Sequence, residues 1–212
     1  MSKHIIAPDS NWSLADMKSD PWIAENSPLS PERLHAIGLI TFRWNQCEFW
    51  LFLLFCKVSG IDQKDAWALV YDLGDIAICS RIKALLANRV FHADGVALIL
   101  NALDAYDINR QNRNTVAHAW TAGQFDGEYV LARKSKKIDA IDPLAFKSDL
   151  ASLRRVAHEI RLVETNLWVL CCVIEDNSIS GPLTAPKRLL LPEALSKPPP
   201  QIHVKRKRLP RS

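Results

Sequence analysis

The segment Arg113-Asn114-Thr115-Val116-Ala117-His118 contains the residue types that best suit chemistry. It ends a predicted helix whose earlier inner face is aliphatic. Asn114 and His118 are four residues apart and so share one face of a helix, and Arg113 is long enough to reach around to it. A helix that turns from aliphatic to Arg, Asn and His must find partners for them, because an unpaired buried charge is costly. We therefore take Arg113, Asn114 and His118 as the candidate functional residues.

Glu48, on the helix predicted over 31–58, also needs a partner if its side chain is buried. The apolar positions there recur at steps of three and four, and Glu48 falls on that predicted seam. We hypothesise that Glu48 pairs in the core with Arg113 or with Arg110. The alternative is that the candidate residues have no catalytic role and form a structural polar network at the helix end. The helix dipole favours cations there whatever their function.

These residues are positioned by a series of predicted helices. Ser30-Pro31-Glu32 is a typical helix start and Gly60 a typical stop, which predicts a helix over 31–58. Asp62 caps a short helix that ends near Gly74, and a third helix covers 75–90. Asp94 caps a fourth, over 95–118, and a fifth runs from about 143 to 176. Asp126-Gly127 between two apolar segments predicts a β-hairpin at about 120–133. The fold class is all-α, a bundle of four to five helices with this hairpin inserted after the motif helix.

The chain divides into an N-terminal arm over 1–29, a helical domain over 30–177 and a Pro-rich tail over 178–212. Eight Lys or Arg against one acid give residues 181–212 a charge of +7, so the other 180 residues sum to −3 and the formal +4 is an average of two unlike parts. We expect the tail to be flexible or extended. Its basic run, Lys205, Arg206, Lys207 and Arg208, is a weak signal for nucleic-acid contact, and a solvated tail fits equally well.

The motif resembles that of the HEPN superfamily of helical domains. The shared pattern is an Arg, four to six residues, then a His near the end of a long helix, often with a polar residue directly after the Arg. Arg113, Asn114 and His118 match it, and the resemblance covers roughly residues 31–176. It implies a helical domain with the motif on a long inner helix.

The resemblance also implies a function. Many HEPN proteins are metal-independent endoribonucleases that dimerise, so that two Arg–His pairs meet in one cleft, and they occur in toxin–antitoxin and antiviral defence systems with a neutralising partner protein. By position, His118 would act as general base or acid, Arg113 would hold the scissile phosphate, and Asn114 would orient His118 or a phosphate oxygen. Arg110 would join the phosphate site or pair only with Asp107 or Glu48. The expected partners are RNA and a second copy of the chain.

One departure from the family concerns regulation. A branch of HEPN toxins has a Tyr two residues after the His, where a partner enzyme modifies the toxin. This chain has Trp120 there. We therefore do not expect that mode of control.

Several classes of site and location are not expected. The five cysteines lack the spacing of zinc ligands, so we predict neither a metal site nor another cofactor. The longest apolar run, 49–56, is far shorter than the roughly 20 residues of a membrane span. The first residues lack the apolar stretch of a secretory signal, and we expect a cytoplasmic protein that does not enter membranes.

Two other functions stay open. The runner-up is a non-catalytic helical module for dimerisation or for binding nucleotides or RNA, in which the Arg–His cluster only holds the fold together. The tryptophans in helical apolar patterns fit either a core or a dimer interface; these are Trp44, Trp50, Trp67 and Trp168. A DNA-binding regulator is poorly supported, since no base-reading motif is apparent.

Overall fold

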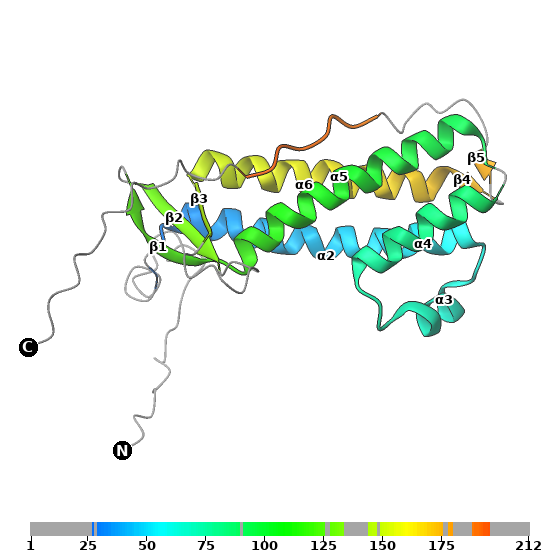
Figure 1. Cartoon of the computed structure of the whole chain (residues 1–212), viewed down its shortest axis with the longest axis horizontal. Helices are drawn as coiled ribbons and strands as arrows, with labels where there is room; N and C mark the ends of the chain where they lie inside the picture. The colour runs from blue at the N-terminus through cyan, green and yellow to red at the C-terminus, as the bar shows by residue number, and fades with distance from the viewer. Residues whose placement is uncertain are drawn as a thin grey trace, which may run out of the picture.

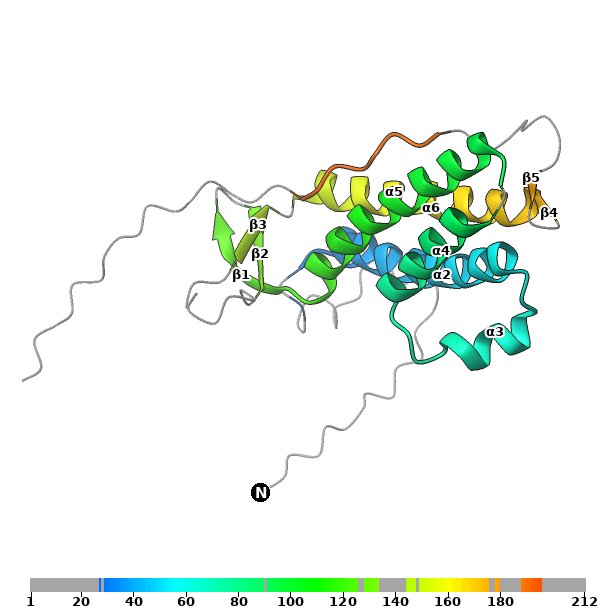
Figure 2. The same cartoon turned by 45° about the vertical axis from the view of Figure 1, so that its right-hand side comes forward.

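The computed structural model describes residues 27, 29–89, 91–125, 128–133, 144–147, 149–175, 178–179 and 188–195. Most of these residues are helical, in agreement with the predicted fold class. Figure 1 shows long helices lying side by side, with a small sheet at one end of them. The turned view in Figure 2 shows the same arrangement. Within the described ranges, each helix is too short or too polar to span a lipid bilayer.

Helix α2 covers Pro31–Ser59 and matches the prediction closely. Pro31 occupies the first turn, and Gly60 ends the helix in the left-handed conformation with φ 67°, donating its N–H to the Cys56 carbonyl. A side chain is strained at that φ, which is why glycine suits the position. In the first half of α2 the buried stripe is rotated by one residue from the predicted seam, since Ala36 and Ile40 are buried rather than Ile37 and Thr41.

The next three helices are α3 (Gln63–Val70), α4 (Asp75–Asn88) and α5 (Ala93–Ala117). Asp62 caps α3 as predicted, its carboxylate accepting the N–H groups of Lys64 and Asp65 at 2.8 and 3.0 Å. The helix ends at Val70, earlier than predicted. The predicted cap of α5 is wrong by two residues: His92 is the N-cap, and Asp94 lies in the first turn, where a carboxylate favours the helix dipole.

Helix α6 covers Leu150–Val173 and is shorter than the predicted helix from 143 to 176. Asp149 caps it, accepting the Ser152 N–H at 2.7 Å. The chain before Asp149 forms strand β3 (Leu144–Lys147), where the sequence predicted the first turn of the helix. The apolar residues there satisfy a strand as well as a helix, and the cap decides where the helix begins.

The core lies where α2 meets α6, α4 and α5. Trp44 of α2 and Tyr106 of α5 pack at its centre with ring centroids 4.6 Å apart. Both side chains are almost fully buried, as are Ile40, Leu51, Ile82, Ile99, Leu103, Ile160 and Leu167. Because α2 packs against all three other long helices, residues on α2 and the end of α5 are held in a fixed relation.

A three-stranded antiparallel sheet stands at the end of the bundle where α5 ends and α6 begins (Figure 1). Its strands are β1 (Trp120–Phe125), β2 (Glu128–Arg133) and β3, in that order, with a register shift between Thr121 and Gly123. Residues 126–127 lie outside the described residues, so the turn at Asp126-Gly127 stays a prediction. Strands β4 (Ile174–Glu175) and β5 (Ser178–Ile179) form a separate small pair after α6.

Residues 188–195, part of the tail predicted to be flexible or extended, lie against α5 and α6 (Figure 1). The side-chain amide of Asn101 bonds both the N–H and the carbonyl of Leu189, at 2.8 and 3.2 Å. Asn112 accepts the Leu195 N–H at 2.9 Å and donates to the Glu193 carbonyl at 2.8 Å. We call residues 188–195 the strap. Most of the arm over 1–29 and the basic run Lys205–Arg208 lie outside the described residues.

Candidate functional site at the end of helix α5

A cavity of about 520 Å³ lies between the middle of α2, α3, the start of α4 and the end of α5. Arg113 and Asn114 line it from α5, Glu48 from α2 and Asp75 from the start of α4. The rest of the wall is largely aromatic or aliphatic: Phe49, Leu51, Phe52, Trp67, Val70, Tyr71, Leu73 and Ile78. Cavities of this size hold small ligands in proteins, and a few polar groups on an apolar wall fix how such a ligand lies.

Arg113 is half-buried and has no acidic partner within the described part of the chain. Its Nη1 donates to Asn114 Oδ1 at 2.9 Å, and its guanidinium carbon lies 6.0 Å from the ring centre of Trp44. Its Nε is buried and bonds none of the described atoms. A guanidinium with unused donors at a cavity is suited to an anion.

Asn114 holds Arg113 rather than His118 among the described atoms. Its side chain is half-buried at the cavity wall. The carboxamide oxygen therefore fixes the direction of the guanidinium, which differs from the orienting role expected from the sequence.

His118 is the C-cap of α5, and its backbone N–H bonds the Asn114 carbonyl at 3.2 Å. Its side chain is exposed and does not belong to the cavity wall. The structure thus brings Arg113 and Asn114 to the cavity and leaves His118 on the surface one turn further along the chain.

The predicted core pair between Glu48 and an arginine is wrong. Glu48 is exposed, and its Oε1 accepts the indole N–H of Trp44 at 2.6 Å. Arg110 bonds Asp107 on its own helix instead, at 2.7 and 3.0 Å. Glu48 lies next to the buried Cys47 and just outside the stripe that packs on the core, so its carboxylate reaches water.

Two buried rings hold the carboxylates of the cavity in place. Trp44 donates to Glu48, and the hydroxyl of Tyr106 donates to Asp75 Oδ2 at 3.4 Å. Burial, and then the nearby carboxylates of Asp75 and Glu48, raise the pKa of Tyr106 far above its ordinary value. Tyr106 therefore stays protonated and remains a donor.

The sequence reasoning missed two residues of this region. The sequence predicts Asp75 only as the first residue of a helix, yet it lines the cavity together with Tyr71. Asn109, one turn before Arg113, is fully buried, and neither atom of its amide bonds any described group. A polar residue four positions before Arg113 on the inner face was the available signal.

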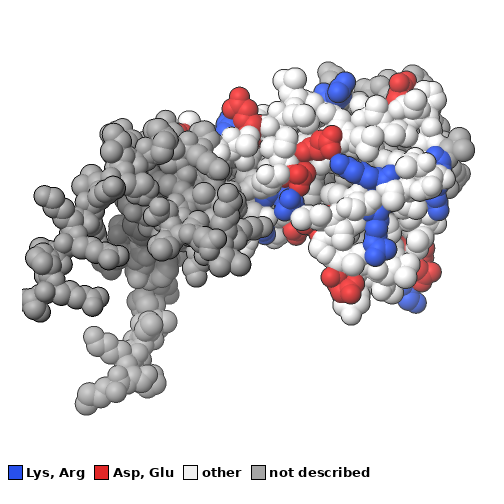
Figure 3. Space-filling view, viewed as in Figure 1, with Lys and Arg blue, Asp and Glu red and all other residues white. Residues whose placement is uncertain are grey.

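Charge on the body of the molecule is mixed. Figure 3 shows acidic and basic side chains interspersed on the described part of one face. Comparison with protein-family models, curated proteins and solved structures finds no match to the chain. The case for a function therefore depends on the motif and the geometry around it.

Proposed function

We propose that the chain is a metal-independent endoribonuclease of HEPN type that acts as a homodimer on cytoplasmic RNA. One observation carries the proposal: Arg113 lines a ligand-sized cavity, and among the described residues its guanidinium bonds only Asn114 Oδ1 and has no acidic partner. The Arg-x4-His motif supplies His118 one turn further along. Phosphate is the anion that a nuclease would place against Arg113.

The proposed reaction uses the RNA strand's own 2′-hydroxyl. Its oxygen attacks the adjacent phosphorus while its proton passes to a base, the bond to the 5′-oxygen breaks, and an acid protonates that oxygen. The products are a 2′,3′-cyclic phosphate and a 5′-hydroxyl. Histidine serves as base or acid because it exchanges a proton near neutral pH. Arg113 stabilises the charge that develops on the phosphoryl oxygens.

A homodimer supplies both proton-transfer groups, since each copy brings one His118 to a shared cleft. The surface position of His118 supports this, because an exposed side chain at the end of a helix can face a second copy. A place in a toxin or antiviral system, with a neutralising partner protein, follows from the resemblance alone.

The alternative is a non-catalytic module for dimerisation or RNA binding. Large apolar side chains exposed on α2, α3 and α4 favour it: Phe42, Phe49, Trp67, Leu69 and Ile76. Such a surface is typical of an interaction site.

The test is RNA cleavage by the purified full chain in excess EDTA. We expect cleavage that leaves 2′,3′-cyclic phosphate and 5′-hydroxyl ends, identified by end-specific labelling and mass spectrometry. Absence of cleavage would leave the binding module as the better account. Cleavage that needs a divalent ion, or that leaves 3′-hydroxyl ends, would contradict the proposed mechanism.

A further inference from the structure

We infer that the cavity binds one unstacked guanine base of an RNA strand whose phosphate lies against Arg113. The inference rests on the proposed function, since it names the base beside the cleaved phosphate. Three features carry it: an exposed aromatic wall, a carboxylate with an oxygen that bonds no described atom, and two opposite charges that line one cavity without pairing.

The aromatic wall offers a stacking surface. Trp67 and Tyr71 are 61% and 69% exposed, and the Tyr71 N–H bonds the Trp67 carbonyl, which places the two on one side of the end of α3. Phe52 meets Trp67 edge to face, with ring centroids 5.5 Å apart at 89°. Phe52 therefore fixes the direction of the Trp67 ring, most of which stays exposed beside the cavity and can contact a planar ligand. Bases of single-stranded RNA stack on such rings.

Glu48 selects the base. Of the two cavity carboxylates, Asp75 already accepts bonds on both oxygens, from the Ile76 N–H and the Tyr106 hydroxyl. Among the described atoms, Glu48 accepts only the Trp44 N–H, on Oε1. Guanine presents two adjacent donors, N1–H and the N2 amino group, which match a carboxylate. The other bases place an acceptor beside their donor, and a carboxylate repels an acceptor.

The two charges of the cavity are held apart. Glu48 and Arg113 line the same cavity but are not within 4.0 Å of each other, although opposite charges attract. Their hydrogen bonds to Trp44 and Asn114 hold each group in place. A nucleotide has a donor edge at one end and an anionic phosphate at the other, so it can contact both.

The experiment is isothermal titration of the wild-type full chain with the four nucleoside 3′-monophosphates, which are not cleaved. We expect the guanosine nucleotide to bind at least about tenfold more tightly than the others. Trp67→Ala should weaken its binding by about tenfold, and Glu48→Gln should abolish the preference for guanine. The matched controls are Trp168→Ala on α6 and Glu32→Gln at the start of α2, which should bind like the wild type.

Equal binding of all four nucleotides, or binding unchanged in both cavity variants, would overturn the inference. The absence of any nucleotide binding would also overturn the inference, and is the result expected if the cavity belongs to a protein-docking surface. Its failure is distinct from that of the proposed function. Guanine-selective binding without RNA cleavage would retain the inference and reject the nuclease, whereas cleavage with equal binding of the four nucleotides would do the reverse.

Discussion

Among the residues that the structure describes, Arg113 combines a charge with few partners. Its contacts are the Asn114 oxygen and the face of Trp44, and its Nε is buried without a bond to any described atom. Had Glu48 been its buried partner, removal of Arg113 would have cost several kcal/mol. Since Glu48 is exposed, removal of Arg113 should affect stability little and cleavage greatly.

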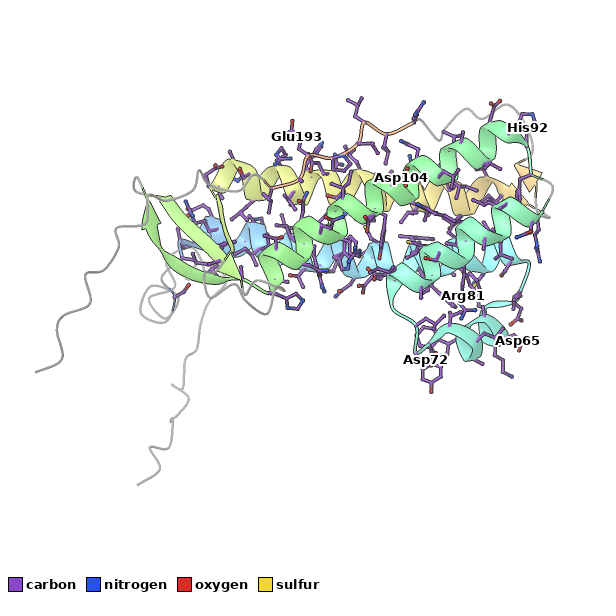
Figure 4. The ribbon with its side chains drawn as sticks, viewed as in Figure 1. Asp65, Asp72, Arg81, His92, Asp104 and Glu193 are labelled. Carbon is purple, nitrogen blue, oxygen red and sulfur yellow. The ribbon has the colours of Figure 1, made fainter. Side chains whose placement is uncertain are left out.

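Arg113→Ala should therefore lower the free energy of unfolding by only about 1 kcal/mol, which is the size of a partly exposed cation–π contact. Cleavage should fall by about a hundredfold, the usual effect of removing one group that stabilises transition-state charge. Urea unfolding and cleavage rates measure the two effects. Arg81→Ala, at an exposed position on α4 (Figure 4), is the control and should change neither. A large loss of stability with cleavage intact would support the structural network instead.

The buried amide of Asn109 should lower the free energy of unfolding. A buried amide without hydrogen bonds costs about 1–3 kcal/mol, so Asn109→Leu, which keeps the shape of the side chain, should raise the free energy of unfolding by about 1 kcal/mol. Asn45→Leu, at an exposed position on α2, serves as control. A comparable loss of stability in Asn109→Leu would show that the amide has a hydrogen-bonded partner.

At the scale of elements, local signals predicted where helices begin and end. Asp62 and Gly60 behave as their residue types predict. The start of α6 was wrong because an apolar run before Asp149 fits a helix as well as strand β3, and pairing with β2 decides between them. The predicted seam of α2 had a larger effect at one position, since Cys47 rather than Glu48 packs on the core and Glu48 lies at the surface.

The sequence did not predict the position of the strap, because that position also depends on contacts between residues far apart in the chain. The prolines and charges of the tail predict a flexible or extended segment, whereas the place of the strap depends on two asparagines far away on α5. Asn101 and Asn112 are eleven residues apart, three turns of one helix, and so face the same way. Each amide supplies one donor and one acceptor, which is what an extended backbone needs.

Asn112→Ala should release the end of the strap. We expect a loss of about 1–3 kcal/mol in the free energy of unfolding, because the buried Leu195 N–H loses its bond and the Glu193 carbonyl keeps only the one from Arg155. Chymotrypsin should then cut near Leu189–Leu191 before the body unfolds, a change visible by mass spectrometry. Asn45→Ala is the control. Equal resistance of Asn112→Ala and wild type to protease would mean that Asn101, Arg155 and the buried Leu195 hold the strap without Asn112.

The proposed shared cleft needs two copies of the chain. Phe42 and Phe49 are 60% and 51% exposed and lie seven residues apart on α2, so they share one face of the helix. Exposure of these apolar side chains to water is unfavourable, which is typical of an interaction surface. A dimer that covers this face would bring two α2 helices together beside the cavities.

Sedimentation velocity should therefore show a dimer for the wild type and a monomer for Phe42→Glu, since a buried charge without a partner opposes association. Thr41→Glu is the matched control, because Thr41 is exposed and directly precedes Phe42; this variant should remain dimeric. A wild type that sediments as a monomer at all concentrations would remove the shared cleft from the account.

The most direct test of the nuclease is the single-turnover cleavage rate of a labelled RNA in EDTA for His118→Ala and His92→Ala. The two histidines are exposed near opposite ends of α5, and Figure 4 shows His92 far from the sheet. We expect His118→Ala to be slower by about a hundredfold or more, with its melting temperature unchanged, because the proton-transfer group is lost. His92→Ala should keep the wild-type rate. Equal rates in the two variants would contradict the account.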